Sequence, residues 1–109
     1  MTFDEVQSLV RAQSAESLSV TNAHRIKLEH AITTPQRISL IFRTVIDGQV
    51  NDVILNAWLV GQEGMTDGYK IVMRDDGKQF GLASVGFPKD LHLVLVGWYG
   101  TLLSAFLAM

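Results

Sequence analysis

Two β-forming runs around an Asp-Gly pair decide the fold of this chain: RISLIFRTVI (37–46), DG (47–48) and QVNDVILNAW (49–58). Asp-Gly favours a two-residue type I′ turn, because both central residues of that turn need φ above zero. Folding the chain about this turn places Arg43 opposite Asp52, and it pairs hydroxyl with amide and apolar with apolar side chains elsewhere. A slip of one residue would break all of these pairs, so the sequence predicts the register as well as the hairpin.

A second pair, Asp76-Gly77, predicts another type I′ hairpin in which Met73 faces Phe80. Alternation then gives each hairpin one apolar face that is expected to form the core: Ile38, Leu40, Phe42, Val53, Leu55 and Ala57 in the first, and Tyr69, Ile71, Met73, Phe80 and Leu82 in the second. The reverse face of the second hairpin carries polar or small residues and is expected to face solvent: Lys70, Arg74, Gln79, Gly81 and Ala83.

Helical and further β patterns flank the hairpins. Thr2 and Glu5 have the spacing of a capping box, which predicts an amphipathic helix over residues 3–13. The remaining expected elements are a strand over 24–32, loops over 62–68 and 86–90, a strand over 91–96 and a helix over 98–107. The predicted fold class is α+β: an antiparallel meander sheet of five or six strands with an N-terminal and a C-terminal helix.

Composition excludes several classes of protein. The 109 residues suit a single α+β domain, 1–109, and 48% hydrophobic with 18% charged residues is typical of a globular chain. A formal net charge of −2 without a basic cluster argues against nucleic-acid binding. The absence of cysteine excludes disulfides, thiolate catalysis and cysteine-ligated zinc. No secretion signal is recognisable at the amino terminus, so a cytoplasmic location is expected.

The carboxy-terminal segment allows a different class. Residues 91–109 carry no formal charge and are close to the length that crosses a bilayer, so a tail-anchored membrane protein is one alternative. The alternation at its start and the glycines at 97 and 100 instead favour a strand followed by a helix that pack on the sheet. Membrane insertion is therefore the less favoured interpretation.

Candidate catalytic groups are few. The three histidines, His24, His30 and His92, lack metal-ligand spacing, and the sequence contains no nucleophile motif or phosphate-binding loop. His30 and His92 are retained only as weak candidates for the polar lining of a ligand site. No catalytic residue, metal or cofactor is predicted.

The most suggestive surface is the reverse face of the first hairpin, which combines an aromatic residue, a guanidinium and β-branched residues. The candidate partner-binding residues are Arg37, Ile41, Val45, Ile54 and Trp58. Either a helix of the same chain covers this face or a partner does. If a partner covers it, a symmetric homodimer is the commonest arrangement. The sequence thus favours a small non-enzymatic interaction or assembly protein. A ligand-binding protein or an enzyme with a pocket lined by Phe42, Leu55, Phe80 and Phe106 is the other alternative.

Overall fold

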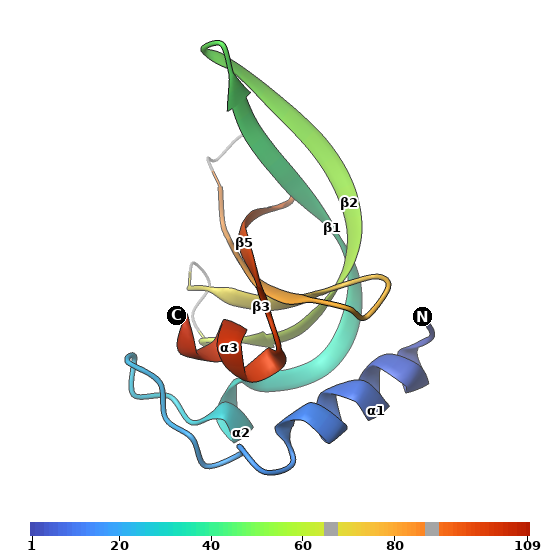
Figure 1. The fold of residues 1–109 in the computed structure, drawn as a ribbon, viewed down its shortest axis with the longest axis vertical. Coiled ribbons are helices and arrows are strands. Elements are labelled where there is room, and N and C mark those ends of the chain that lie inside the picture. Colours follow the sequence, from blue (N-terminus) through green and yellow to red (C-terminus); the bar gives the residue numbers. More distant parts are fainter. Residues whose placement is uncertain (65–67, 87–89) are drawn as a thin grey trace.

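The computed structural model describes residues 1–64, 68–86 and 90–109, so the loops expected over 62–68 and 86–90 lie partly outside the described residues. Its elements, in chain order, are α1 (Phe3–Ser14), α2 (Leu28–Ala31), β1 (Ile32–Ile46), β2 (Gln49–Gln62), β3 (Lys70–Arg74), β4 (Phe80–Ser84), β5 (Leu93–Gly100) and α3 (Leu102–Leu107). Figure 1 shows the three helices gathered at one end of a strongly curved sheet.

The five strands form a closed barrel in the order β1-β2-β3-β4-β5. Neighbours along the chain pair antiparallel, whereas β5 pairs with β1 in parallel, through Leu40 with Leu93 and Ile41 with Val94. The predicted antiparallel meander sheet with flanking helices is therefore wrong. Strand direction alternates along a meander, so an odd number of strands leaves the first and last pointing the same way, and their closing pair must be parallel. Register shifts at 32/36 in β1 and 59/61 in β2 help the long strands to curve.

The registers of both predicted hairpins are confirmed. β1 pairs with β2 from Ile46 opposite Gln49 back to Arg37 opposite Trp58, and β3 pairs with β4 with Met73 opposite Phe80. At the first turn the φ angles of Asp47 and Gly48 are 51° and 77°, as a type I′ turn requires.

The type I′ prediction is wrong for the second hairpin. There only Gly77 has a positive φ, of 74°, and its N–H donates to the carbonyl of Arg74 at 2.9 Å. The Arg74 N–H donates in turn to the Gln79 carbonyl, so the connection is a longer loop that needs only one left-handed residue.

Two hydrophobic cores lie on opposite sides of the barrel wall. The inner core, contributed by all five strands, contains Leu40, Ala57, Val72 and Ala83 with Ile38, Leu55, Leu59, Leu93, Leu95 and Trp98 packed against them. The outer core joins the other strand face to the helices and includes Trp58, Met73 and Phe80 together with Val6, Val10, Leu102 and Phe106. Both sides of the lower barrel are consequently covered.

This arrangement corrects the predicted faces. Trp58 pairs with Met73, so the two faces expected to form one core lie on opposite sides of the wall. The face expected to be solvated lines the barrel instead: Gly81 and Ala83 are buried, and Lys70 is only 7% exposed. Small residues are required there because a Cβ at Gly81 would approach Trp98 Cε3 to 2.7 Å. The small residues of β4 therefore indicate a crowded barrel interior and not a solvent-exposed surface.

Local predictions were mixed. Helix α1 is confirmed with its capping box: Thr2 N–H donates to Glu5 Oε1 at 2.9 Å, and Glu5 N–H donates to Thr2 Oγ1 at 3.2 Å. The strand expected over 24–32 is wrong, because that segment forms a bridge of Thr21 with Lys27 and then the single turn α2, which buries Leu28.

The carboxy-terminal helix is shorter than predicted. Trp98 belongs to β5, and α3 begins at Leu102 after Thr101, whose hydroxyl accepts the Ser104 N–H. The segment 91–109 is therefore a strand and a short helix. Among the described residues, no helix is long and apolar enough to cross a membrane.

The hairpin of β1 and β2 extends beyond the other strands of the barrel. Pairing of β1 with β5 ends at Ile41, and pairing of β2 with β3 begins at Ala57. Residues 42–56 therefore form a two-stranded arm, which projects from the barrel on the side away from the helices (Figure 1). Within the described part of the chain, no third strand pairs with this arm.

Candidate functional site

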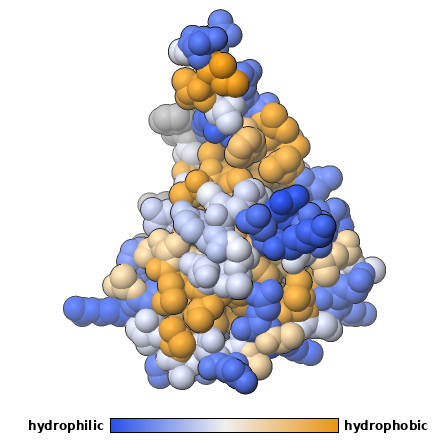
Figure 2. Space-filling model, viewed as in Figure 1, coloured by the Kyte–Doolittle hydropathy of each residue, from blue (hydrophilic) through white to orange (hydrophobic). Residues whose placement is uncertain are grey.

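The arm exposes apolar side chains on both of its faces. Exposure reaches 67% for Val45 and 55% for Ile54, and the full set of exposed large apolar residues on the arm is Phe42, Val45, Ile46, Val50, Val53 and Ile54. Figure 2 shows this apolar surface below the hydrophilic tip of the projection. A hairpin of two strands has no core of its own, so these side chains remain in water unless a partner covers them.

The structure divides the predicted partner-binding residues. Val45 and Ile54 are exposed on the arm, whereas Ile41 is 5% and Trp58 only 4% exposed. Trp58 belongs to the outer core beside the helices, and Arg37 lies above it with its guanidinium carbon 5.1 Å from the ring centroid. At the barrel end of this face, the helices and Arg37 of the same chain therefore cover Trp58.

Asp75 ties the Trp58 region together. The Trp58 indole N–H donates to Asp75 Oδ1 at 3.2 Å, and Arg37 Nη2 lies 3.4 Å from the same oxygen. The amino group of Met1 lies 3.9 Å from it. The polar edge of the buried ring is thereby satisfied, which is the usual condition for burying tryptophan.

Arg43 holds the base of the arm through two carboxylates. Its Nε and Nη2 donate to the two oxygens of Asp52, both at 2.8 Å, while Nη1 and Nη2 donate to Asp90 at 3.2 and 2.9 Å. The hydrogen bonds that Arg43 donates to Asp52 and to Asp90 raise the pKa of Arg43 above its ordinary value, so the guanidinium stays charged. This double fork connects both arm strands to the segment that precedes β5.

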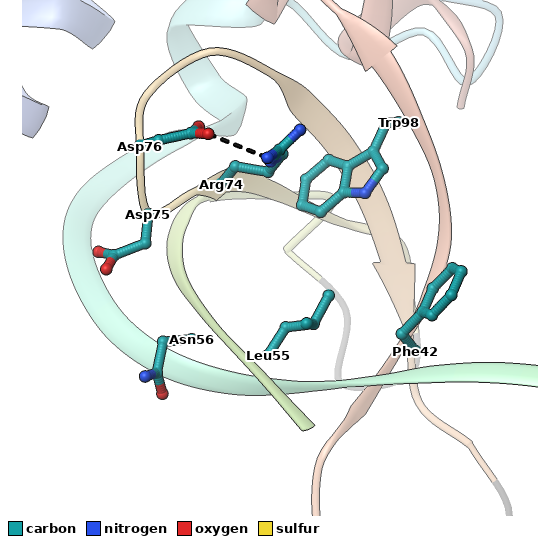
Figure 3. Close-up of a pocket in the computed structure, with 7 residues that line it drawn as sticks. All are labelled: Phe42, Leu55, Asn56, Arg74, Asp75, Asp76 and Trp98. Carbon is teal, nitrogen blue, oxygen red and sulfur yellow. Dashed lines mark ion pairs between the residues drawn. The ribbon is translucent and has the colours of Figure 1, made fainter. Parts of the chain in front are cut away.

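A cavity of about 580 Å³ opens at the base of the arm, at the mouth of the barrel. Its lining comes from the arm, the end of β3, the β3–β4 loop and β5: Phe42, Leu55, Asn56, Arg74, Asp75, Asp76 and Trp98. Figure 3 shows Leu55, Trp98 and Arg74 pointing toward a common space, with Asp75 and Asn56 directed away from it. Arg74 Nη2 lies 3.0 Å from Asp76 Oδ2.

The predicted pocket is only half present. Phe42 and Leu55 do line the cavity, but Phe80 and Phe106 are fully buried in the outer core. Sequence reasoning missed Arg74, assigned to a solvated face, and Trp98, assigned to a helix. The available signal for Trp98 was the pair of small residues at 81 and 83 on the facing strand, which leave room for one large side chain.

The histidines do not converge on a site. His30 is exposed on α2 with Nε2 3.8 Å from Glu29 Oε1, and His92 is exposed just before β5. His24 contacts Glu63, with Nδ1 and Oε1 2.8 Å apart, and its ring stacks on that of Tyr69 at 6.3 Å. Among the described residues, no group of three histidine, cysteine, aspartate or glutamate side chains could hold a metal ion.

Comparison with known proteins adds no family. No family model matches this chain, and neither a curated protein nor a solved structure matches it.

Proposed function

We propose that this protein is a non-enzymatic interaction protein that assembles as a homodimer through the exposed arm. The observation that carries the proposal is the set of six exposed apolar residues on a projecting ribbon that is paired with no third strand in the described part of the chain. Apolar surface concentrated on a protrusion is typical of a contact site, because a protrusion has little surface of its own with which to cover it.

The order of residues along one arm face favours a second copy as the partner. Three cross-strand rungs follow one another: Ile41 with Ile54, Arg43 with Asp52, and Val45 with Val50. The sequence apolar, ion pair, apolar reads the same from either end. A second arm related by a two-fold axis through the central rung would place its Val45–Val50 rung against the Ile41–Ile54 rung of the first arm. Its own Ile41–Ile54 rung would then lie against the Val45–Val50 rung of the first arm. Such an isologous contact is the commonest form of homodimer.

The test is the molar mass of the purified protein by light scattering over a range of concentrations. We expect a dimer whose dissociation constant rises about tenfold or more in Ile54→Asp, because a charge would be placed against the apolar Val45 rung of the second arm. Leu107→Asp is the matched control, since Leu107 is 49% exposed and lies on α3, at the end of the barrel away from the arm.

Two results would contradict the proposal. One is a monomer at every concentration. The other is a dimer that Ile54→Asp and Leu107→Asp affect equally. Circular dichroism of both variants shows whether the fold is retained. Because the Ile54 side chain is exposed, we expect Ile54→Asp to keep the fold.

A further inference from the structure

The geometry of the barrel mouth points to a second binding site, independent of the proposed dimer. We infer that the cavity between the arm, the β3–β4 loop and β5 binds a small carboxylate with an aromatic body. Its volume of about 580 Å³ falls within the range of about 300–1,000 Å³ usual for sites that take small molecules.

The apolar part of the site suits a flat ring. Phe42 and Leu55 come from facing strands of the arm base, and Trp98 comes from β5 across the barrel mouth. Trp98 is half-buried, so one part of its ring packs into the inner core while another part remains available to a ligand. Two aromatic walls favour a planar aromatic group through offset or edge contacts.

The charged part of the site selects an anion. Arg74 is directed toward Trp98 in Figure 3, and its side chain is 44% exposed. A guanidinium presents five N–H donors in one plane, so the pair with Asp76 leaves donors for a second carboxylate. Arg74 is thus the group at the cavity that a ligand carboxylate would reach.

The two neighbouring carboxylates are already engaged by the protein. Asp76 accepts the Lys78 N–H at 2.9 Å with Oδ1 and contacts Arg74 with Oδ2. Asp75 accepts the Trp58 indole N–H, pairs with Arg37 and points away from the cavity (Figure 3). A cationic ligand would have to displace protein groups from the oxygens of Asp75 and Asp76, whereas an anion can accept hydrogen bonds from Arg74 directly.

The experiment titrates the labelled protein with naphthylacetate and, separately, with its neutral amide, naphthylacetamide, and follows the tryptophan indole N–H signals by proton–nitrogen NMR. The chain has two tryptophans. We expect naphthylacetate to shift the Trp98 signal saturably and to leave the Trp58 signal in place, because Trp58 is buried against Asp75. The amide should bind about fivefold more weakly, the size of one exposed charged contact.

Charge variants at the end of β3 and in the β3–β4 loop sharpen the test. Arg74→Gln should weaken naphthylacetate binding about fivefold and leave the amide unchanged, whereas Asp76→Asn should strengthen naphthylacetate binding by releasing Arg74. Lys78→Gln is the control, because it removes the same charge from the exposed part of this loop without lining the cavity.

Three outcomes would overturn the inference: no saturable shift of Trp98, equal binding of acid and amide, or equal effects of Arg74→Gln and Lys78→Gln. Repeating the titration on Ile54→Asp separates this site from the proposed dimer. Ligand binding that persists in that variant supports the cavity whatever the outcome for self-association.

Discussion

Replacing Gly81 with alanine should destabilise the barrel sharply although it adds a single methyl group. An ideal Cβ at this position would lie 2.3 Å from the carbonyl oxygen of Gly97 and 2.7 Å from Trp98 Cε3, where real Cβ atoms essentially never come closer than 3.0 Å. The nearest obstacle is backbone of the paired strand, so a change of side-chain rotamer cannot remove it. β4 and β5 must move apart at a point where the barrel is closed.

The expected loss is about 2 kcal/mol of unfolding free energy, in the middle of the range for overpacked cores. Alanine also restricts the unfolded chain, a gain of roughly 0.5 kcal/mol that is already included in this net figure. For a domain of about this length, 2 kcal/mol lowers the melting temperature by about 10 °C.

Gly97→Ala is the matched control on the neighbouring strand. Its Cβ would meet only Tyr99 ring atoms, at 3.5 Å or more, which is ordinary van der Waals contact. Urea unfolding followed by circular dichroism should show a lower midpoint for Gly81→Ala at an unchanged slope, and almost no change for Gly97→Ala. Equal stability of Gly81→Ala and the parent chain, or equal losses in both variants, would refute the account of a crowded barrel interior.

Three further predictions concern the helix cap, the buried indole and the first turn. The pKa of Glu5 lies below its ordinary value of 4.5 because the Thr2 N–H donates to its carboxylate. The stability that the ionised Glu5 carboxylate adds is present above pH 4.5 and is lost as pH falls through the lowered pKa. The unfolding free energies of Glu5→Gln and the parent should therefore converge on acidification. Trp58→Phe keeps a six-membered aromatic ring in the outer core but removes the pyrrole ring with its N–H donor to Asp75, so urea unfolding should report a loss of at least about 1 kcal/mol, and an unchanged unfolding free energy would contradict a role for that hydrogen bond. Gly48→Ala should cost about 1 kcal/mol because φ is 77° there, with Gly48→Asn, which tolerates this conformation, losing less in the same assay.

The registers could be predicted because they depend on neighbours that the sequence pairs by itself. Opposite charges at 43 and 52 and a turn that demands positive φ leave one alignment of the first hairpin. The capping box was equally local. Interactions within a few residues, or across one turn, are visible in a sequence.

Closure of the barrel could not be predicted in the same way. It depends on the pairing of β5 with β1, which joins positions about fifty residues apart and leaves no local mark in either strand. The same limitation applies to Leu28. Its alternation with Ile26 suggested a strand, but burial of that leucine against the outer core is achieved by a single helical turn.

The arm follows from strand lengths more than from its own composition. β1 and β2 have 15 and 14 residues, whereas their other neighbours in the barrel, β5 and β3, have eight and five, so these neighbours end while the first hairpin continues. One uninterrupted pattern of apolar residues on both faces therefore meets two environments. In the barrel those residues are covered by the inner core and the helices; beyond Ile41 and before Leu55 they face water. In the proposed dimer, a second copy of the arm would cover one of these faces. The cavity at the arm base, with Phe42 in its wall, lies where the two environments meet.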